Sequence, residues 1–223
     1  MPAKRATQRE FDQEATHEAH ASYTHKKESG TLRCTINIET FGTYTSIRRL
    51  DVDFFLQLAN KKTVTIGELI AWYVRKDELT AKDIPAWIGE LLGARAKASD
   101  ENFTAELRMV SKMLYTKSGE PSDSVQQYSQ QLATPRFVFI EMFKLFEDSR
   151  GKGLGPQVLN EDDNIVSVLS LARDASTEVA NKYTDVQVEQ KLQAQYAKSG
   201  YATWVQGDPD VDGSVTIMGR IVQ

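Results

Sequence analysis

The sequence contains little of the chemistry that most enzymes use near neutral pH. Of its 223 residues one is cysteine, Cys34, and three are histidine, so the 198 residues after His25 contain no histidine. Histidine is the side chain that most often exchanges protons at this pH, and thiolates and imidazoles are the usual ligands of soft metals. These absences favour a protein that binds or assembles over an enzyme. We therefore expect no catalytic residues and no cofactor.

Long apolar runs and a second cysteine are also missing. A single cysteine cannot form an internal disulfide, so a reducing compartment is expected. The first residues are polar and lack the apolar core of a signal peptide, and no run approaches the roughly 20 residues of a membrane span. The sequence therefore predicts a cytoplasmic or virion location and no membrane partner.

Two kinds of pattern predict the fold. Residues 31–39 alternate apolar and polar side chains, which indicates a half-buried strand, and residues 43–49 can return as a second strand. Cys34 falls on the apolar side of the first strand, which predicts a buried thiol. Helix-type spacing and capping residues then recur, and they predict helices over residues 54–60, 66–76, 84–92, 101–116, 134–150, 160–181 and 184–200.

These patterns predict a mainly α fold, a helical body of about seven helices with β-hairpins near the N- and C-termini. The expected organisation is a polar N-terminal arm (1–30), a β-hairpin (31–49), the helical body (50–200) and a C-terminal β-hairpin or arm (201–223). In the first arm Phe11, Ala15, Ala19 and Tyr23 recur every four residues, which is typical of a narrow helical stripe. Such ends offer strand edges to another chain.

Acidic and histidine clusters are the candidate metal sites. Asp208, Asp210 and Asp212 precede Gly213 in the spacing of a calcium loop, where alternate carboxylates face one cation. The twelfth position of this loop requires a bidentate Glu and is Gly219 here, so a calcium site would lack one ligand. The alternative is that these residues form a hairpin turn. His17 and His20 would share one side of a helix, but a solvated arm is the dominant interpretation.

Basic residues near the first hairpin are the candidate nucleic-acid site. Contacts to phosphates are expected from six side chains, with aromatic residues nearby: Arg33, Arg48, Arg49, Lys61, Lys62 and Arg136. The net charge of −4 argues against a dedicated monomeric binder. Many weak contacts could still add up in a polymer.

The glycine-rich segment 151–156 invites comparison with a phosphate-binding loop. Such a loop follows a strand and precedes a helix, whereas this segment follows a predicted helix and ends in Pro156. The sequence therefore favours a helix terminus and a connector here.

The leading functional hypothesis is a non-enzymatic structural subunit of a macromolecular assembly. The arrangement of arm, helical body and arm is similar in architecture to helical viral coat and nucleocapsid proteins, which implies self-association into a homo-oligomer and, through phosphate contacts, RNA or DNA packaging. The partners would be other copies of the chain and nucleic acid.

Two alternatives remain. The first is an oligomeric DNA- or RNA-binding regulatory or accessory factor, because residues 65–92 look like the N-terminal helical part of MucR/Ros bacterial regulators; the chain lacks the residues for their zinc finger. The second is an enzyme that uses carboxylates and a divalent cation, for which Glu141, Asp148, Asp162 and Asp163 are available.

Overall fold

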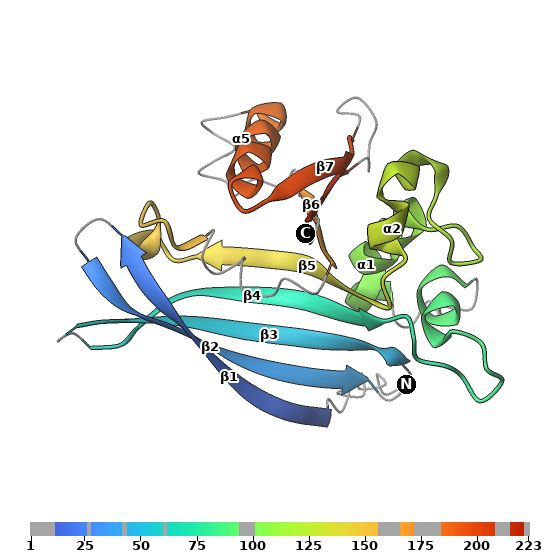
Figure 1. The fold of residues 1–223 in the computed structure, drawn as a ribbon, viewed down its shortest axis with the longest axis horizontal. Helices are drawn as coiled ribbons and strands as arrows, with labels where there is room; N and C mark the ends of the chain where they lie inside the picture. The colour runs from blue at the N-terminus through green and yellow to red at the C-terminus, as the bar shows by residue number, and fades with distance from the viewer. Residues whose placement is uncertain are drawn as a thin grey trace, which may run out of the picture.

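The protein is built on one eight-stranded sheet (Figure 1). The computed structural model describes residues 12–25, 28–41, 44–59, 62–93, 101–155, 166–171, 184–207 and 215–220. The strand order is β1-β2-β3-β4-β5-β6-β8-β7. The strands are β1 (Asp12–His25), β2 (Glu28–Phe41), β3 (Tyr44–Leu58), β4 (Val64–Arg75), β5 (Arg136–Leu145), β6 (Val166–Leu171), β7 (Tyr201–Val205) and β8 (Thr216–Arg220).

One pair of neighbouring strands in this sheet is parallel, and the other pairs are antiparallel. Strands β1 to β5 are antiparallel to their neighbours, β5 and β6 are parallel, and β8 pairs antiparallel with both β6 and β7. Since parallel neighbours need a long crossover connection, the chain leaves the sheet after β5 and returns to it at β6. This parallel pair lies in the middle of the sheet.

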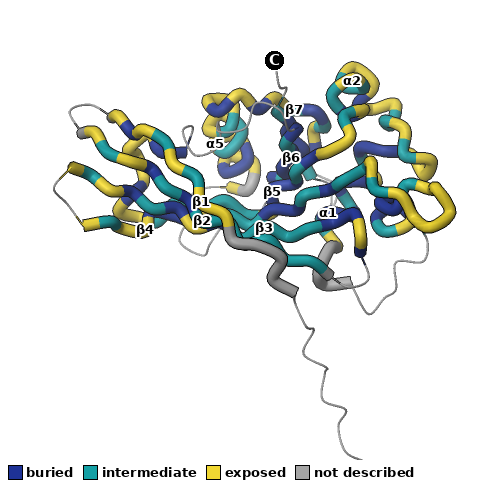
Figure 2. Tube along the Cα trace, turned by 60° about the horizontal axis from the view of Figure 1, so that its bottom comes forward, coloured by how far each residue is buried: buried dark blue, intermediate teal, exposed yellow. Residues whose placement is uncertain are grey.

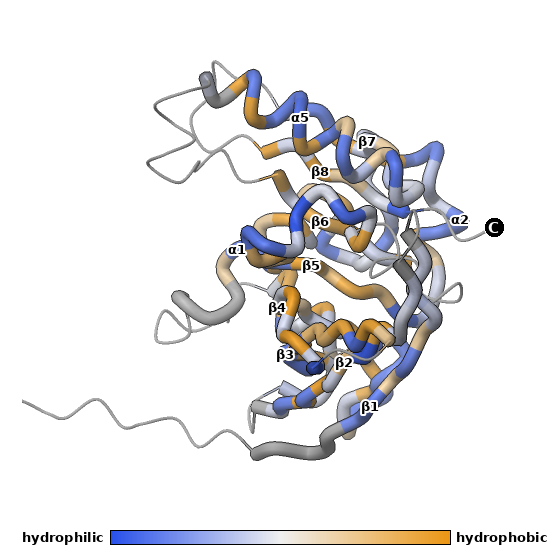
Figure 3. Tube along the Cα trace, turned by 90° about the vertical axis from the view of Figure 1, so that its left-hand side faces the viewer, coloured by the Kyte–Doolittle hydropathy of each residue, from blue (hydrophilic) through white to orange (hydrophobic). Residues whose placement is uncertain are grey.

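Short helices and turns cover parts of both sheet faces. They are η1 (Ile88–Leu92), α1 (Glu101–Leu114), η3 (Asp123–Tyr128), α2 (Ser129–Leu132), η4 (Glu147–Ser149) and α5 (Asp185–Ala197). We call the side that packs on α1 the α1 face and the side that packs on α5 the α5 face. Figure 2 shows that burial is densest where β5 and β6 lie between these helices, and Figure 3 shows apolar residues concentrated in the central strands.

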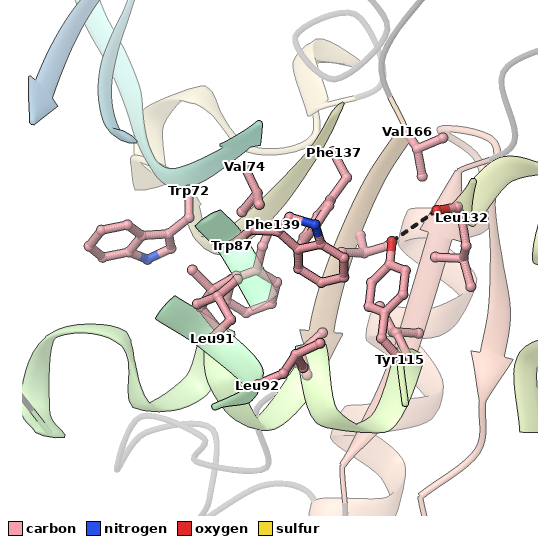
Figure 4. Close-up of a cluster of buried hydrophobic side chains, with 14 of the residues drawn as sticks. Trp72, Val74, Trp87, Leu91, Leu92, Tyr115, Leu132, Phe137, Phe139 and Val166 are labelled. Atoms are coloured by element: carbon pink, nitrogen blue, oxygen red, sulfur yellow. Dashed lines mark hydrogen bonds between the residues drawn. The ribbon is translucent and has the colours of Figure 1, made fainter. Parts of the chain in front are cut away.

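The largest hydrophobic cluster lies on the α1 face (Figure 4). Alternate residues of β4 and β5, such as Trp72 and Phe139, pack there against η1 and α1. Tyr115 donates a hydrogen bond from its hydroxyl to the carbonyl of Leu132, which ties the end of α1 to α2. The α5 face has its own cluster, in which Ala71 and Ile140 lie under α5.

The prediction of a mainly α fold with seven helices is wrong, because the described residues form mostly strands. The error lies chiefly in β4 and β5, which the helix pattern covers with residues 66–76 and 134–150. Both strands have buried side chains on both faces, such as Ala71 on the α5 face and Trp72 on the α1 face of β4, and a strand of this kind loses the alternation of polar and apolar residues. A continuous apolar run then matches helix spacing by chance. The resemblance of residues 65–92 to two regulator helices fails for the same reason, because β4 occupies 64–75.

Other parts of the pattern match the structure. The helices predicted over 101–116 and 184–200 are confirmed as α1 and α5, and Thr184 forms the capping box at the start of α5. Cys34 is buried, as predicted. The helical stripe predicted in the N-terminal arm is wrong, because residues 12–25 form β1, in which Ala19, Ala21 and Tyr23 pack on the α5 face with a period of two. Among the described helices none has the length and apolar character needed to cross a membrane.

Candidate functional site

The parallel strands β5 and β6 separate halfway along β5. Their register runs from Phe137 opposite Val166 to Ile140 opposite Leu169 and stops there, although β5 continues to Leu145 beside β4. Ligands of open sheets bind at the carboxyl ends of strands where the strand order or direction changes. The point at which the pairing of β5 and β6 ends, called the opening below, is therefore a candidate ligand site.

A β-bulge marks the point of separation. Ala71 lies opposite Ile140 and Ile70 lies opposite Met142, so Glu141 is the extra residue on β5. Beyond it, residues 142–145 pair with β4 on one side and have no strand partner on the other side within the described part of the chain. Apart from the Leu145 carbonyl, which accepts from Arg150 Nε, their outward backbone N–H and C=O groups have no strand partner among the described residues; we call this the free edge, and it is able to pair with an extended molecule.

A glycine-rich turn over residues 150–155 follows this free edge. Gly151 and Gly153 have φ values of +72° and +68°, a conformation that glycine adopts without strain. Successive backbone N–H groups in such turns form concave sites for anions. Arg150 and Lys152 add positive charge, and Lys152 is exposed.

The turn is fixed to the body of the protein. Arg150 Nε donates to the carbonyl of Leu145 over 3.0 Å, and the Tyr23 hydroxyl donates to the carbonyl of Lys152 over 3.1 Å. Leu154 is buried in the cluster of the α5 face. The sequence predicted that this segment follows a helix over residues 134–150. That prediction is wrong, because the segment follows β5 and the single 3₁₀ turn η4.

Two carboxylates lie near the point of separation on the α1 face. Glu106 of α1 accepts a hydrogen bond from Ser170 of β6, and Glu141 of the bulge accepts one from Trp72 Nε1. Burial raises the pKa of Glu106; the Ser170 bond lowers it and the charge of Glu141 raises it further. A carboxyl group with a raised pKa beside an opening is a candidate proton acceptor.

The basic residues predicted from the sequence do not form one stripe. Arg48 and Arg49 are neighbours on β3 and therefore point to opposite faces. On the α1 face, Arg49 pairs with Asp51 over 2.9 Å, and the Arg33 guanidinium lies 5.1 Å from the centre of the Phe55 ring. Lys62 is exposed beside β4, and Lys61 lies outside the described residues.

Arg48 and Arg136 do come together, on the α5 face. With Arg75 they surround a hollow of about 400 Å³, whose other lining residues are Ile38, Leu50 and Tyr73. Arg75 was missed because residues 66–76 were assigned to a helix. In a strand, the alternation of Tyr73 and Arg75 puts both on one face, and this spacing was the available signal.

The predicted metal sites find no support in the described residues. Asp208, Asp210 and Asp212 lie outside them. His17 and His20, which would share a helix face, lie on opposite faces of β1, and His20 Nε2 is 3.9 Å from a carboxylate oxygen of Glu18. Within the described part of the chain no group of three His, Cys, Asp or Glu side chains could hold an ion.

Comparisons with protein-family models, with curated proteins and with solved structures found no match.

Proposed function

We propose that the protein is an enzyme that binds a phosphorylated group carrier in the opening between β5 and β6. The observation on which this rests is that separating parallel strands, a pair of carboxylates and a glycine-rich turn follow one another along the second half of β5 and the turn after it. Each feature alone is common in structural roles. Together they supply a proton acceptor at the bulge, a backbone edge over residues 142–145 and an anion site at the turn after β5.

The phosphate groups would bind at the turn. The backbone N–H groups of residues 151–155 and the side chains of Arg150 and Lys152 supply the donors and the positive charge. Tyr23 and Leu154 hold the turn in place, so little conformational freedom would be lost on binding.

The arm of the carrier would run back along β5. Residues 141–145 span about 15 Å at the rise of a strand, and amide groups on the ligand would pair with the free backbone edge as an added strand does. The arm then ends at the bulge, near Glu141 and Glu106. There the carried group would form a bond to a nucleophile while its bond to the carrier breaks. One of the two carboxylates would take the proton of the nucleophile and then give it to the leaving atom of the carrier.

Calorimetric titration of the purified protein tests the binding step. Coenzyme A has both phosphates and an amide-bearing arm, whereas adenosine diphosphate has phosphates alone. We expect coenzyme A to bind about tenfold more tightly, because each backbone hydrogen bond contributes about 1 kcal/mol. Equal affinities would contradict the placement of the arm along β5, and failure of both to bind would contradict the proposal as a whole.

Two variants localise the ligand. Lys152→Gln should weaken both ligands, while Lys117→Gln, which alters an exposed lysine after α1, should not. Gly151→Ala should also weaken binding, because a Cβ at Gly151 would meet no neighbouring atom and yet the φ of +72° would be strained. Gly89→Ala is its control, since a Cβ there also meets nothing and no positive φ is involved.

Self-association is a second candidate function, favoured by the free edge of β1. This strand runs over 14 residues and, within the described part of the chain, pairs with β2 alone; an edge of this length is a template for another strand. If β1 pairs antiparallel with β1 of a second copy about Ala19, Glu18 of each copy faces His20 of the other. An assembly of this kind matches the structural subunit that the sequence predicts.

Light scattering after size exclusion tests this assembly. Glu18→Lys and His20→Glu alone should each shift the protein towards monomer, and the double variant should restore the association because the opposed charges are exchanged. Single variants that associate like the parent protein would contradict the pairing. The ultraviolet absorbance spectrum of the particles reports whether they contain the predicted nucleic acid.

A further inference from the structure

The hollow on the α5 face is framed by three arginines from three adjacent strands. Arg48 of β3 lies opposite Tyr73 of β4, and Arg75 of β4 lies opposite Arg136 of β5. Ile38 and Leu50 also lie opposite each other and supply an apolar wall. Guanidinium groups, a phenol ring and aliphatic side chains thus meet in one space of about 400 Å³.

Two positive charges directly opposite each other in a sheet destabilise it, so the Arg75–Arg136 pair needs an explanation. Asp77 lies 4.0 Å from Arg75 Nε and 3.9 Å from Arg136 Nη2, and Glu78 lies 2.8 Å from Arg75 Nη2. Neither acid lines the hollow. Both acids belong to the turn after β4, so they offset the charge from outside the sheet.

The third arginine has backbone partners. Arg48 Nη1 donates to the carbonyl of Thr45 over 2.9 Å and to that of Ile47 over 3.4 Å. These two carbonyls orient the Arg48 guanidinium at the rim of the hollow. Three guanidinium groups therefore line the hollow, and the described lining residues include no acid.

We infer that this hollow binds a small molecule in which a carboxylate or phosphate group is attached to an apolar body. The planar guanidinium fork matches both anions, and an anion between Arg75 and Arg136 would relieve their repulsion. Tyr73, Ile38 and Leu50 would cover the apolar body. The volume lies within the usual range for small-molecule sites, about 300–1,000 Å³.

This inference does not depend on the proposed function. Arg136 is the first residue of β5, whereas the glycine-rich turn comes after the last residue, Leu145. The two sites therefore lie at opposite ends of the same strand. A ligand at one end can be measured without a ligand at the other.

Three probes that share a ring test the inference by calorimetry: benzoate, phenyl phosphate and benzyl alcohol. We expect benzoate or phenyl phosphate to bind and benzyl alcohol to bind at least about tenfold more weakly, since a charge-assisted hydrogen bond contributes about 1.5–3 kcal/mol. The tighter of the two anions identifies the anionic group. Binding of the alcohol as tightly as the anions, or binding of none of the three, would overturn the inference.

Variants place the bound probe in the hollow. Arg136→Gln changes an exposed side chain and should weaken the bound anion about tenfold. Arg48→Lys should weaken it less than Arg48→Gln, because lysine keeps the charge and loses the fork. Arg33→Gln on the opposite face is the matched control. If the anion binds equally to Arg136→Gln, Arg48→Gln and Arg33→Gln, with unchanged melting temperatures, the site is elsewhere and the inference is wrong.

Discussion

Lys76 offers the sharpest test of the packing around η1 and α1. It follows β4, and its ammonium donates to the carbonyl of Leu132 and lies 3.5 Å from the Tyr115 hydroxyl. The same group lies 5.1 Å from the centre of the Tyr115 ring and 5.8 Å from that of Trp87. Burial lowers the pKa of Lys76 from 10.5 to about 8, and the charge of Glu120 opposes this effect.

This lowered pKa makes stability depend on pH. Between about pH 8 and 10.5 the unfolded chain keeps the proton that the folded protein has lost, so the free energy of unfolding rises with pH. Between pH 7 and 9.5 the full effect would be about 2 kcal/mol. Because the ammonium is partly exposed and two rings and a carbonyl stabilise its charge, we expect about 1 kcal/mol.

Denaturant unfolding at pH 7, 8, 9 and 9.5 measures this rise. The range stops below pH 10 because burial raises the pKa of Tyr196 to about 12 and of Tyr201, which lowers stability above the ordinary tyrosine pKa. Lys76→Met should abolish the rise, and Lys117→Met should leave it. The reasoning is refuted if the Lys76→Met variant shows the same rise as the parent protein.

Three further substitutions test the core and the candidate site. Gly219→Ala should lower the free energy of unfolding by about 3 kcal/mol, because its Cβ would lie 2.2 Å from Cε2 of buried Trp204; denaturant unfolding against Gly89→Ala checks this. Leu91→Ala should cost about 3 kcal/mol in the same assay, because Leu91 is fully buried under the α1 face. Glu106→Gln should remove a loss of stability as pH rises from about 4.5, since the folded pKa is raised above the unfolded one, and parallel pH series of the two proteins measure it.

The parts of the fold that could be predicted from the sequence are those with one exposed face. Strand β2 alternates because one of its faces packs in a hydrophobic cluster while the other carries polar side chains. Helix α1 is amphipathic, and α5 begins at the capping box of Thr184. In β4 and β5 the local sequence does not show one apolar face and one polar face. Helices packed on the two sides of the sheet cover the central residues of both strands, and these helices lie far away along the chain.

The candidate site depends on the same distant information. Glu106, Glu141 and Ser170 come from α1, β5 and β6, and no spacing in the sequence relates them. The glycine-rich turn was visible as a motif, but its interpretation depended on whether a strand or a helix came before it. Arg48 and Arg136 were selected for their charge, and only the register of β3, β4 and β5 shows that Arg75 joins them.

One extra residue in β5 connects these observations. The bulge at Glu141 reverses which face the following side chains occupy, so Phe143 and Leu145 pack with the cluster that includes Leu154 of the turn. Without the extra residue, these two side chains would point to the α1 face and the turn would lose its apolar anchor. The shift that places the turn also puts Glu141 where it affects the pKa of Glu106. The anion-binding turn and the carboxylate pair therefore depend on a single irregularity, and deletion of Glu141 should disrupt both.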